Sequence, residues 1–341
     1  MVARRADISA MLEMLPPFAV RVAATLRLSD HIADGHTGLK ALARAGGADP
    51  DALGRLLRYL VQLGLYTEPE PGTYAVTPAG RMLATAHPSG LRAWLDLDGP
   101  GGRMDLALAG LLHAVRTGEP GYDRVHGRSF WDDLAADPAR GDAFDALMAG
   151  KSRRVAADLA AVVPWDGTRH LVDVGGGRGA TMIAVLGAHP GLRGTVFDLP
   201  GPAAGARAAV REAGLADRCD VVAGSFLDDA VPEGDTHLLF DILHDWDDAT
   251  AAAILRRCAA VSRRVLVVED IPAGEPDRWS VAADLKMLTL FAGRQRTAAQ
   301  LAALGAVAGL RAVHPAAPVA LPGGFAYVEF RPGAGEGGTP A

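Results

Sequence analysis

Cysteine is scarce in this chain. Cys219 and Cys258 are the only two among 341 residues, and they stand far apart in the sequence. Such a pair makes neither a disulfide scaffold nor a cysteine-rich metal site, and scarce cysteine is typical of proteins that fold in a reducing compartment. We therefore expect a cytoplasmic protein.

Long apolar runs and an excess of positive charge are also missing. No uncharged apolar stretch approaches the roughly 20 residues that span a membrane, and the first residues contain no apolar run long enough for a signal peptide. The formal net charge of −6 disfavours nucleic acids and acidic membranes as partners. With 49% hydrophobic and 22% charged residues, the chain has the composition of a globular protein, and its length suffices for two domains.

Residues 1–165 are predicted to form a mainly helical domain. Apolar positions at helical spacings predict a helix from about 8 to 33 and a short helix over 39–43. Asp49 and Pro50 begin another helix, because aspartate caps a first turn and proline suits its first position.

A two-stranded wing is predicted after that helix, which we expect to end at Gly64. Short strands at 65–68 and 73–77 are joined by a Pro-Glu-Pro-Gly turn. Helices followed by such a hairpin are the pattern of a winged helix. Residues 89–163 are again predicted to be mostly helical, and the Pro-Trp-Asp-Gly segment at 164–167 is expected to link two domains.

The pattern changes in the second half of the chain. Apolar strands alternate with helical stretches, which predicts parallel βαβ units and an α/β fold with a doubly wound sheet. The predicted strands are 170–174, 194–197, 219–222, 237–242 and 264–268, with a hairpin of 311–314 and 325–330 joined through 321–324. We expect this domain to span 166–332 and a disordered, glycine-rich tail to span 333–341.

A glycine-rich turn follows the first of these strands. Its glycines let the backbone turn tightly and approach a ligand closely, and Gly175, Gly177 and Ala180 also fit a dinucleotide fingerprint. Asp173 favours a different ligand, because a carboxylate there would repel a pyrophosphate and attract a cation such as the ammonium of S-adenosylmethionine. An aspartate that merely shapes the turn is the alternative interpretation.

The ends of the next two strands suit an adenosine. Asp198, followed by Leu199, lies about twenty residues beyond the glycine loop, where an acidic side chain binds ribose hydroxyls. The third strand ends at Gly224, Ser225 and Phe226, which offer a short polar side chain and a ring that could flank adenine. These residues do not separate a nicotinamide dinucleotide from S-adenosylmethionine, since both contain adenosine.

His244 follows the fourth strand, and Glu269 ends the fifth. Ligands of a doubly wound sheet bind beyond the carboxyl ends of its strands, so these two residues converge with those at the other strand ends. A histidine with a pKa near ~6.5 accepts a proton at neutral pH, and a phenol with a pKa near ~10 is an easier donor than an aliphatic alcohol. His244 is therefore our candidate general base, with Glu269 to orient its ring. A simple helix-start residue is the alternative.

The acidic residues after His244 do not indicate a metal site. Asp245, Asp247 and Asp248 are placed to begin the next helix, where acidic side chains suit the helix dipole. We therefore expect no metal.

Four segments resemble, in order, the motifs of one family. They are 171–179, 197–200, 243–248 and 293–297. The family is that of the caffeic acid and hydroxyindole O-methyltransferases, which includes bacterial members that modify aromatic polyketides and other antibiotics. The winged-helix region is similar as well, so the resemblance covers nearly the whole chain. The histidine–aspartate–tryptophan motif is specific, whereas the glycine loop is not.

The resemblance implies a class I methyltransferase with a Rossmann-like sheet, S-adenosylmethionine as cofactor, and a homodimer whose intertwined N-terminal domains help to close each site. It implies that His244 deprotonates a hydroxyl, expected to be phenolic, of a small aromatic secondary metabolite. The residues placed at the cofactor are Asp173, Gly175, Gly177, Asp198, Leu199, Gly224, Ser225, Phe226 and Arg153, and those at the substrate are Met148, Trp246, Met287 and Phe291. Ordinary core methionines and a surface Arg153 are the alternatives.

Two positions depart from the family pattern. Ser225 stands where an aspartate is common in the family, so we expect the adenosine contacts to differ. Gln295 replaces the second of two glutamates that bracket the histidine in plant members, while Glu269 matches the first. An amide hydrogen-bonds imidazole but does not stabilise imidazolium as a carboxylate does. The base is therefore expected to be weaker, or tuned for a more acidic phenol.

Three other functions fit parts of the sequence. One is an enzyme of the same fold that keeps S-adenosylmethionine without methylating, such as a hydroxylase or a pericyclic catalyst. Such enzymes need not retain the histidine, so the presence of His244 disfavours this alternative. A winged-helix DNA-binding regulator is disfavoured, because residues 51–63 offer only Arg55 and Arg58 as cations. A nicotinamide-dependent oxidoreductase is disfavoured by Asp173. The identity of the acceptor, and O- versus N-methylation, are not encoded in any motif.

Overall fold

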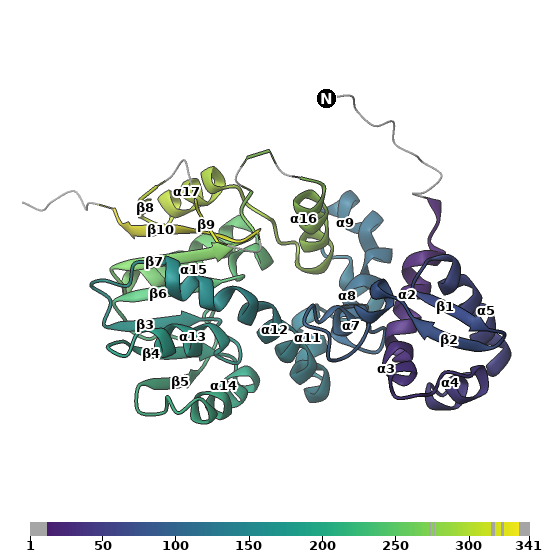
Figure 1. Cartoon of the computed structure of the whole chain (residues 1–341). Coiled ribbons are helices and arrows are strands. Elements are labelled where there is room, and N and C mark those ends of the chain that lie inside the picture. Colours follow the sequence, from purple (N-terminus) through teal and green to yellow (C-terminus); the bar gives the residue numbers. More distant parts are fainter. Residues whose placement is uncertain (1–11, 273, 276, 315–317, 322–323, 334–341) are drawn as a thin grey trace, which may run out of the picture. The chain divides into compact units, whose positions relative to one another are not determined.

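The computed structural model describes residues 12–272, 274–275, 277–314, 318–321 and 324–333. The chain divides into two compact units, Met1–Leu106 and Ala107–Ala341, drawn in Figure 1. Each unit has a hydrophobic core of its own.

The first unit is helical with one small hairpin. Its helices are α2 (Leu15–Thr25), α3 (Leu28–Ala33), α4 (Leu39–Ala45), α5 (Pro50–Gln62), α6 (Pro78–Arg81), α7 (Leu91–Leu95) and α8 (Pro100–Leu106). Strands β1 (Tyr66–Glu70) and β2 (Thr73–Val76) pair antiparallel, which confirms the predicted wing.

Helix α5 begins and packs as the sequence predicts. The side chain of Asp49 accepts a hydrogen bond from the backbone N–H of Ala52 (2.9 Å) and so caps the helix. Leu53, Leu57 and Leu60 recur at helical spacing and are buried in the core of this unit.

The prediction of a single helix over 8–33 is wrong, because the helix is interrupted between α2 and α3. Arg27 adopts a left-handed conformation with φ of +52°, which a continuing helix does not allow. Residues 8–11 of the predicted helix lie outside the described part of the chain.

The second unit opens with helices and continues as an α/β sheet. The opening elements are η1 (Ala107–Gly110), α9 (Leu111–Thr117), α10 (Tyr122–His126), α11 (Phe130–Ala135) and α12 (Pro138–Val162). The strands are β3 (His170–Val174), β4 (Arg193–Asp198), β5 (Cys219–Ala223), β6 (Thr236–Phe240), β7 (Arg264–Glu269), β8 (Leu310–Ala312), β9 (Val319–Ala320) and β10 (Ala326–Pro332). The helices between them are α13 (Ala180–Ala188), α14 (Pro200–Glu212), η2 (Leu243–Asp245), α15 (Asp248–Ala260), α16 (Arg278–Phe291) and α17 (Ala298–Val307).

The sheet is doubly wound, as predicted. Its strand order is β5-β4-β3-β6-β7-β10-β8, and β3 to β7 run parallel while β10 pairs antiparallel with β7, β8 and β9. The chain moves outward from β3 through β4 to β5 and then returns to place β6 on the other side of β3. The carboxyl ends of β3 and β6 therefore form the switch point at which such sheets bind ligands.

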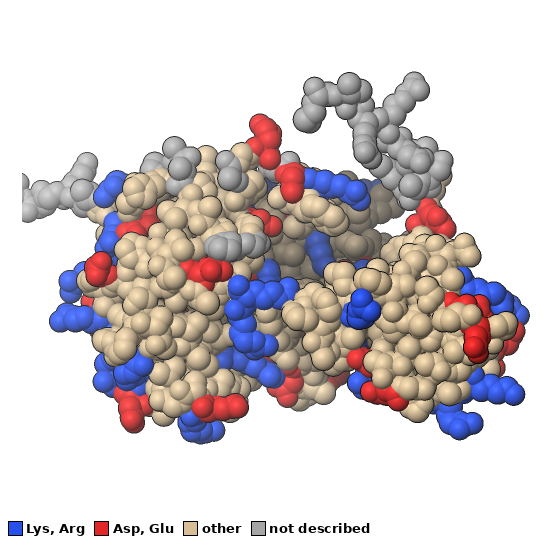
Figure 2. All heavy atoms as spheres, viewed as in Figure 1, with Lys and Arg blue, Asp and Glu red and all other residues tan. Residues whose placement is uncertain are grey.

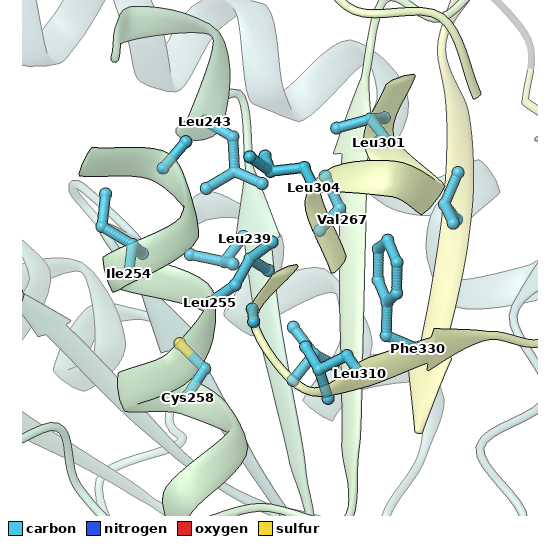
Figure 3. Close-up of a cluster of buried hydrophobic side chains, with 14 of the residues drawn as sticks. Leu239, Leu243, Ile254, Leu255, Cys258, Val267, Leu301, Leu304, Leu310 and Phe330 are labelled. Atoms are coloured by element: carbon cyan, nitrogen blue, oxygen red, sulfur yellow. The ribbon is translucent and has the colours of Figure 1, made fainter. Parts of the chain in front are cut away.

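Both faces of the sheet are buried, which explains the nearly continuous apolar strands. Alternate side chains of one strand, such as Val265 and Val267, pack with α15 and α17 on one face, where Figure 3 shows Leu239, Leu255 and Phe330 among the buried residues. Leu266 and Val268 point to the other face, where α12, α13 and α14 pack.

The second unit begins earlier than the domain boundary predicted after residue 165. Helix α12 belongs to it because Val155 and Leu159 are buried with the residues of α13. The segment 164–167, predicted as a linker, is packed as well: Trp165 is buried, and its ring N–H donates a hydrogen bond to the carbonyl of Ala160 (3.1 Å).

The predicted terminal hairpin is present as the antiparallel pairing of β10 with β8, and the short strand β9 adds to it. Residues 322–323 of the predicted connection and 334–341 of the predicted disordered tail lie outside the described residues.

Candidate active site

The predicted site residues gather at the carboxyl edge of the sheet. Asp173, Asp198 and Glu269 lie at the ends of β3, β4 and β7, and His244 lies in η2, three residues after Asp241 at the end of β6. Because β3, β4, β6 and β7 are parallel neighbours, their ends meet at one edge.

The glycine loop requires its glycines. Gly175 has φ of +72°, and a Cβ there would collide with the side chain of Ile242 beyond β6. Gly177 has φ of +56°, and its N–H donates a hydrogen bond to Oδ2 of Asp198 (2.7 Å). The loop therefore fills the switch point closely and is tied to the neighbouring strand.

Asp198 is fixed by two backbone donors. Its second oxygen, Oδ1, accepts from the N–H of Leu199 (2.7 Å). Burial raises the pKa of Asp198, while the hydrogen bonds from Gly177 and Leu199 lower it in part. The carboxyl group is thus oriented by the backbone, and its remaining lone pairs are available to ligand hydroxyls.

Asp173 is a buried carboxyl without a partner. Its side chain is 1% exposed, and neither oxygen has a hydrogen-bond partner among the described residues. Burial, together with the negative charge of Asp198, raises the pKa of Asp173 to about 7. An unsatisfied buried carboxyl is unfavourable, so this position suits a ligand that brings a donor or a cation.

The end of β5 has the predicted shape but a different hydrogen-bond pattern. Gly224 packs against the ring of Phe197 with no room for a Cβ. The polar groups of Ser225 are used within the turn, since its N–H donates to Asp229 and its hydroxyl to Asp228. The half-buried ring of Phe226 lies near the glycine loop.

The segment that carries His244 is held rigidly by Arg296. This buried guanidinium donates to the carbonyls of Leu243 (2.7 Å) and Trp246 (2.8 Å) and pairs with Asp248 (2.8 Å). The N–H of Arg294 donates to the carbonyl of His244 (2.8 Å). Arg296 lies in the 293–297 motif, but its role became visible only in the structure.

The ring of His244 is buried between an amide and a carboxyl group. Its Nδ1 lies 3.1 Å from the Gln295 amide nitrogen, and its Nε2 lies 3.4 Å from Oδ1 of Asp245. Burial lowers the pKa of His244 to about 4, although the negative charge of Asp241 opposes this effect. The imidazole is therefore neutral at neutral pH.

The Gln295 amide determines which ring nitrogen can act as a base. If its oxygen, which otherwise has no partner among the described residues, faces the ring, it accepts from Nδ1–H and leaves the lone pair on Nε2 free. With the nitrogen of the amide toward Nδ1, the proton sits on Nε2 instead. Only the first arrangement makes Nε2 a base.

Glu269 does not orient the ring, so that part of the sequence prediction was wrong. Its Oε1 accepts a hydrogen bond from the backbone N–H of His244 (3.0 Å), and Oε2 has no partner among the described residues. Burial and the negative charge of Asp241 raise the pKa of Glu269 to about 8. Glu269 therefore positions the backbone of His244 while Gln295 contacts its ring.

Aromatic rings form one wall near the site. Trp131 of α11 stacks on Trp246 (6.2 Å between ring centroids, 10° between planes) and on Phe291 of α16 (5.6 Å, 19°). Phe226 meets Trp246 edge to face (6.0 Å), and Phe130 meets Phe291 in the same way (4.9 Å). The sequence analysis found Trp246 and Phe291 but missed Trp131, because nothing in the sequence pairs α11 with the strand ends.

The predicted residues on α12 and α16 differ in their surroundings. Met148 and Met287 are half-buried, whereas Arg153 is exposed. Lys151, which the sequence analysis did not single out, forms a 2.6 Å ion pair with Asp241. Burial opposes the charged form of Lys151, but the neighbouring carboxylates, Asp241 foremost, outweigh it and raise its pKa above the usual value.

The acidic residues after His244 are only partly placed as expected. Asp247 caps α15 by accepting from the N–H of Thr250 (2.8 Å), and Asp248 pairs with Arg296. Asp245 instead lies against the His244 ring, and burial raises its pKa well above the ordinary value. Within the described ranges, no group of three or more His, Cys, Asp or Glu residues is arranged to hold a metal ion. No helix in that part of the chain is long and apolar enough to cross a membrane.

Comparison with known families matches both halves of the chain. Residues 108–311 match the O-methyltransferase domain, and residues 9–86 match the O-methyltransferase dimerisation domain.

Individual proteins are similar over nearly the whole length. The chain is 45% identical to 2,7-dihydroxy-5-methyl-1-naphthoate 7-O-methyltransferase of Streptomyces carzinostaticus, over 92% of this chain and 95% of that protein. It is 40% identical to aclacinomycin 10-hydroxylase RdmB of Streptomyces purpurascens, over 93% and 87%. The crystal structure of NcsB1, an O-methyltransferase from neocarzinostatin biosynthesis in complex with S-adenosylmethionine and 2-hydroxy-5-methyl naphthoic acid, superimposes with a TM-score of 0.89 at 42% identity, covering 97% of this chain and all of that one.

Proposed function

The chain belongs to the O-methyltransferase family, and we propose that it transfers a methyl group from S-adenosylmethionine to a phenolic hydroxyl of a small aromatic secondary metabolite, with His244 as the general base. The observation that carries the proposal is the position of a neutral, buried histidine at the same sheet edge as the glycine loop and two carboxyl groups. Among the similar proteins above, one enzyme is named for a dihydroxynaphthoate and one crystal structure contains a hydroxynaphthoic acid.

The residues at the edge fit the cofactor part by part. Asp198, oriented by Gly177 and Leu199, suits the ribose hydroxyls. Gly224 and Phe226 suit the adenine side, where Ser225 shapes the turn. The unpartnered carboxyl of Asp173 suits the ammonium group, which would hold it ionised. What bound S-adenosylmethionine supplies is an electrophilic methyl group on a positively charged sulfur.

The weak basicity of His244 limits how the proton can leave. With a pKa of about 4 for His244 and ~10 for an ordinary phenol, complete proton transfer before methylation would cost about 8 kcal/mol. We therefore expect Nε2 to take the proton as the methyl group arrives, while Gln295 accepts from Nδ1–H. An acceptor whose hydroxyl is acidified by its ring suits this base best.

The aromatic residues fit the acceptor. Trp131, Trp246 and Phe291 supply flat apolar surfaces beside His244, on which an aromatic ring can stack. Positioning the hydroxyl in line with the methyl group supplies much of the rate, since well-oriented reactants avoid several kcal/mol of entropic barrier. Met148 and Met287 are proposed to complete this pocket.

Assembly and location complete the proposal. The matched dimerisation domain, residues 9–86, supports a homodimer, while the cofactor and substrate residues proposed here lie within the matched O-methyltransferase domain, residues 108–311. The two cysteines are free and buried, as suits a reducing cytoplasm. Basic and acidic side chains are both spread over the face seen in Figure 2, so that face offers no single basic surface for nucleic acid.

The test is methyl transfer with His244→Gln. We incubate the native protein with methyl-labelled S-adenosylmethionine and a panel of hydroxynaphthoic acids, and expect a labelled ether and one S-adenosylhomocysteine per product. His244→Gln should lose about 10²–10⁴ in kcat and keep its affinity for S-adenosylhomocysteine.

His170→Gln is the matched control, because His170 lies at the amino end of β3, on the opposite edge of the sheet. A product that gains oxygen rather than methyl would assign the chain to the chemistry of the hydroxylase relative. Full activity of His244→Gln would remove His244 as the base.

A further inference from the structure

Helix α12 crosses the carboxyl edge of the sheet. Near its start, Asp145 lies close to Asp198 of β4: burial and then the charge of Asp198 raise the pKa of Asp145 to about 7. Farther along, Lys151 reaches Asp241 beyond β6. Six residues of helix rise roughly 9 Å, and β4 and β6, which flank β3, are two strand spacings or roughly 9.6 Å apart. The helix therefore spans the crevice from the ribose side to the switch point.

Lys151 brings a cation to the switch point. Its Nζ lies 2.6 Å from Oδ2 of Asp241 and 5.3 Å from the centre of the Phe325 ring. An ammonium group has three donors, and these contacts use one of them as a hydrogen bond. Its side chain is 30% exposed, so a ligand can reach it.

Asp241 is shaped to hold this lysine. Its φ is +55°, a left-handed conformation that is uncommon for residues other than glycine, although aspartate adopts it more readily than most. The carboxyl group is mostly buried, and its Oδ1 has no hydrogen-bond partner among the described residues. The left-handed turn thus places this carboxylate against Lys151.

The helical period separates Lys151 from Arg153. Two residues of helix turn through roughly 200°, so these two cations lie on opposite faces of α12. Lys151 lies within roughly 40° of the buried Val155, whereas Arg153 is exposed. Only Lys151 faces the sheet edge.

We propose that Lys151, held by Asp241, binds the α-carboxylate of the methionine part of S-adenosylmethionine, the role that the sequence analysis gave to Arg153. The inference rests on the proposed function and specifies its cofactor site. Asp173 and the Lys151–Asp241 pair lie at the ends of the neighbouring strands β3 and β6. The adjacent strand ends thus offer an acid for the α-ammonium and a cation for the α-carboxylate.

The experiment compares two ligands that differ only in this carboxylate. Calorimetric titration with S-adenosylhomocysteine and with S-adenosyl-3-thiopropylamine, its decarboxylated analogue, gives a preference ratio for each protein. We expect the native chain to prefer S-adenosylhomocysteine by at least about tenfold, the range of a charge-assisted hydrogen bond. Lys151→Met should bind both ligands alike, while Lys151→Arg and the control Arg153→Met should keep the preference.

A second variant separates ligand binding from folding. Lys151→Met leaves Asp241 buried without its cation, which by itself can disturb the site. The double variant Lys151→Met/Asp241→Asn removes that charge. If it regains the preference for S-adenosylhomocysteine over the analogue, Lys151 is merely structural and the inference is overturned. If the preference stays lost, the inference is supported. An intact preference in Lys151→Met overturns the inference alone. Failure of the native chain to bind S-adenosylhomocysteine at all overturns the proposed function instead.

Discussion

Replacing Asp173 by Asn should stabilise the ligand-free protein at high pH while weakening its hold on the cofactor. In the folded state burial raises the pKa of Asp173 to about 7 from the ordinary aspartate value of 3.8. The folded protein therefore keeps a proton that the unfolded chain loses between these values, and its free energy of unfolding falls as pH rises through this window. A difference of about 3 pKa units corresponds to at most about 4 kcal/mol, fully developed only above pH ~7.

Urea unfolding without ligand at pH 5 and pH 8 tests this reasoning. The native chain should lose about 3 kcal/mol of stability relative to Asp173→Asn between the two pH values, because about 2 pH units of the window lie above pH 5. The exposed Asp220, on β5, provides Asp220→Asn as a control that should follow the native chain. Titration with S-adenosylhomocysteine near pH 7 in buffers of different ionisation heat should show more proton release by the native chain than by Asp173→Asn, whose affinity should fall about 10–100-fold.

Parallel stability of Asp173→Asn and the native chain across this pH range would show that the Asp173 carboxyl is solvated or paired, and would refute the argument. An unchanged affinity for S-adenosylhomocysteine would remove Asp173 from the ammonium site even if the stability result holds.

Two further predictions concern the base and the glycine loop. Gln295→Glu should raise the pKa of His244 and move the acid limb of the kcat/KM profile upward by about one unit, because a carboxylate at 3.1 Å favours imidazolium more than an amide does; Gln300→Glu, in the exposed capping box of α17, is the matched control, and an unmoved limb would exclude Gln295 from tuning the base. Gly175→Ala should lose most S-adenosylhomocysteine binding and lower the melting temperature, because a Cβ meets Ile242 and φ is +72°; Gly187→Ala on α13, where a Cβ meets nothing, should leave both unchanged.

The sheet was predictable because a simple pattern, an apolar strand followed by a helical stretch, recurs along the second half of the chain. Five apolar strands alternating with helices leave a parallel, doubly wound arrangement as the simplest solution, and the topology then brings Asp173, Asp198 and Glu269 to one edge. The interruption of the helix at Arg27 was not predictable from hydrophobic spacing. The apolar pattern continues through this residue, although its backbone is left-handed. The boundary predicted after residue 165 failed to mark the compact units because α12 packs on α13, a contact that no composition change announces.

The site was predictable only where strand ends position it. The sequence analysis missed Lys151, Asp241 and Trp131 because their roles depend on where α12 and α11 lie relative to the strand ends. Helix periodicity alone does not give that placement. The prediction correctly placed Glu269 next to His244, but it assigned the contact to the ring rather than to the backbone N–H. A strand-end position brings its carboxyl group near His244, yet only the conformation of η2 decides that the backbone N–H, rather than the ring, meets it.

The carboxyl groups at this edge share a property that bears on turnover. The pKa values of Asp145, Asp173 and Glu269 lie at about 7 to 8 because burial disfavours their charge. Each is therefore poised to ionise when a cation arrives and to take up a proton when the cation leaves. Methyl transfer removes the positive charge from sulfur but leaves the α-ammonium group in place. We therefore expect Asp173 to stay ionised with the product as it does with the methyl donor, and to take up its proton only when the product leaves.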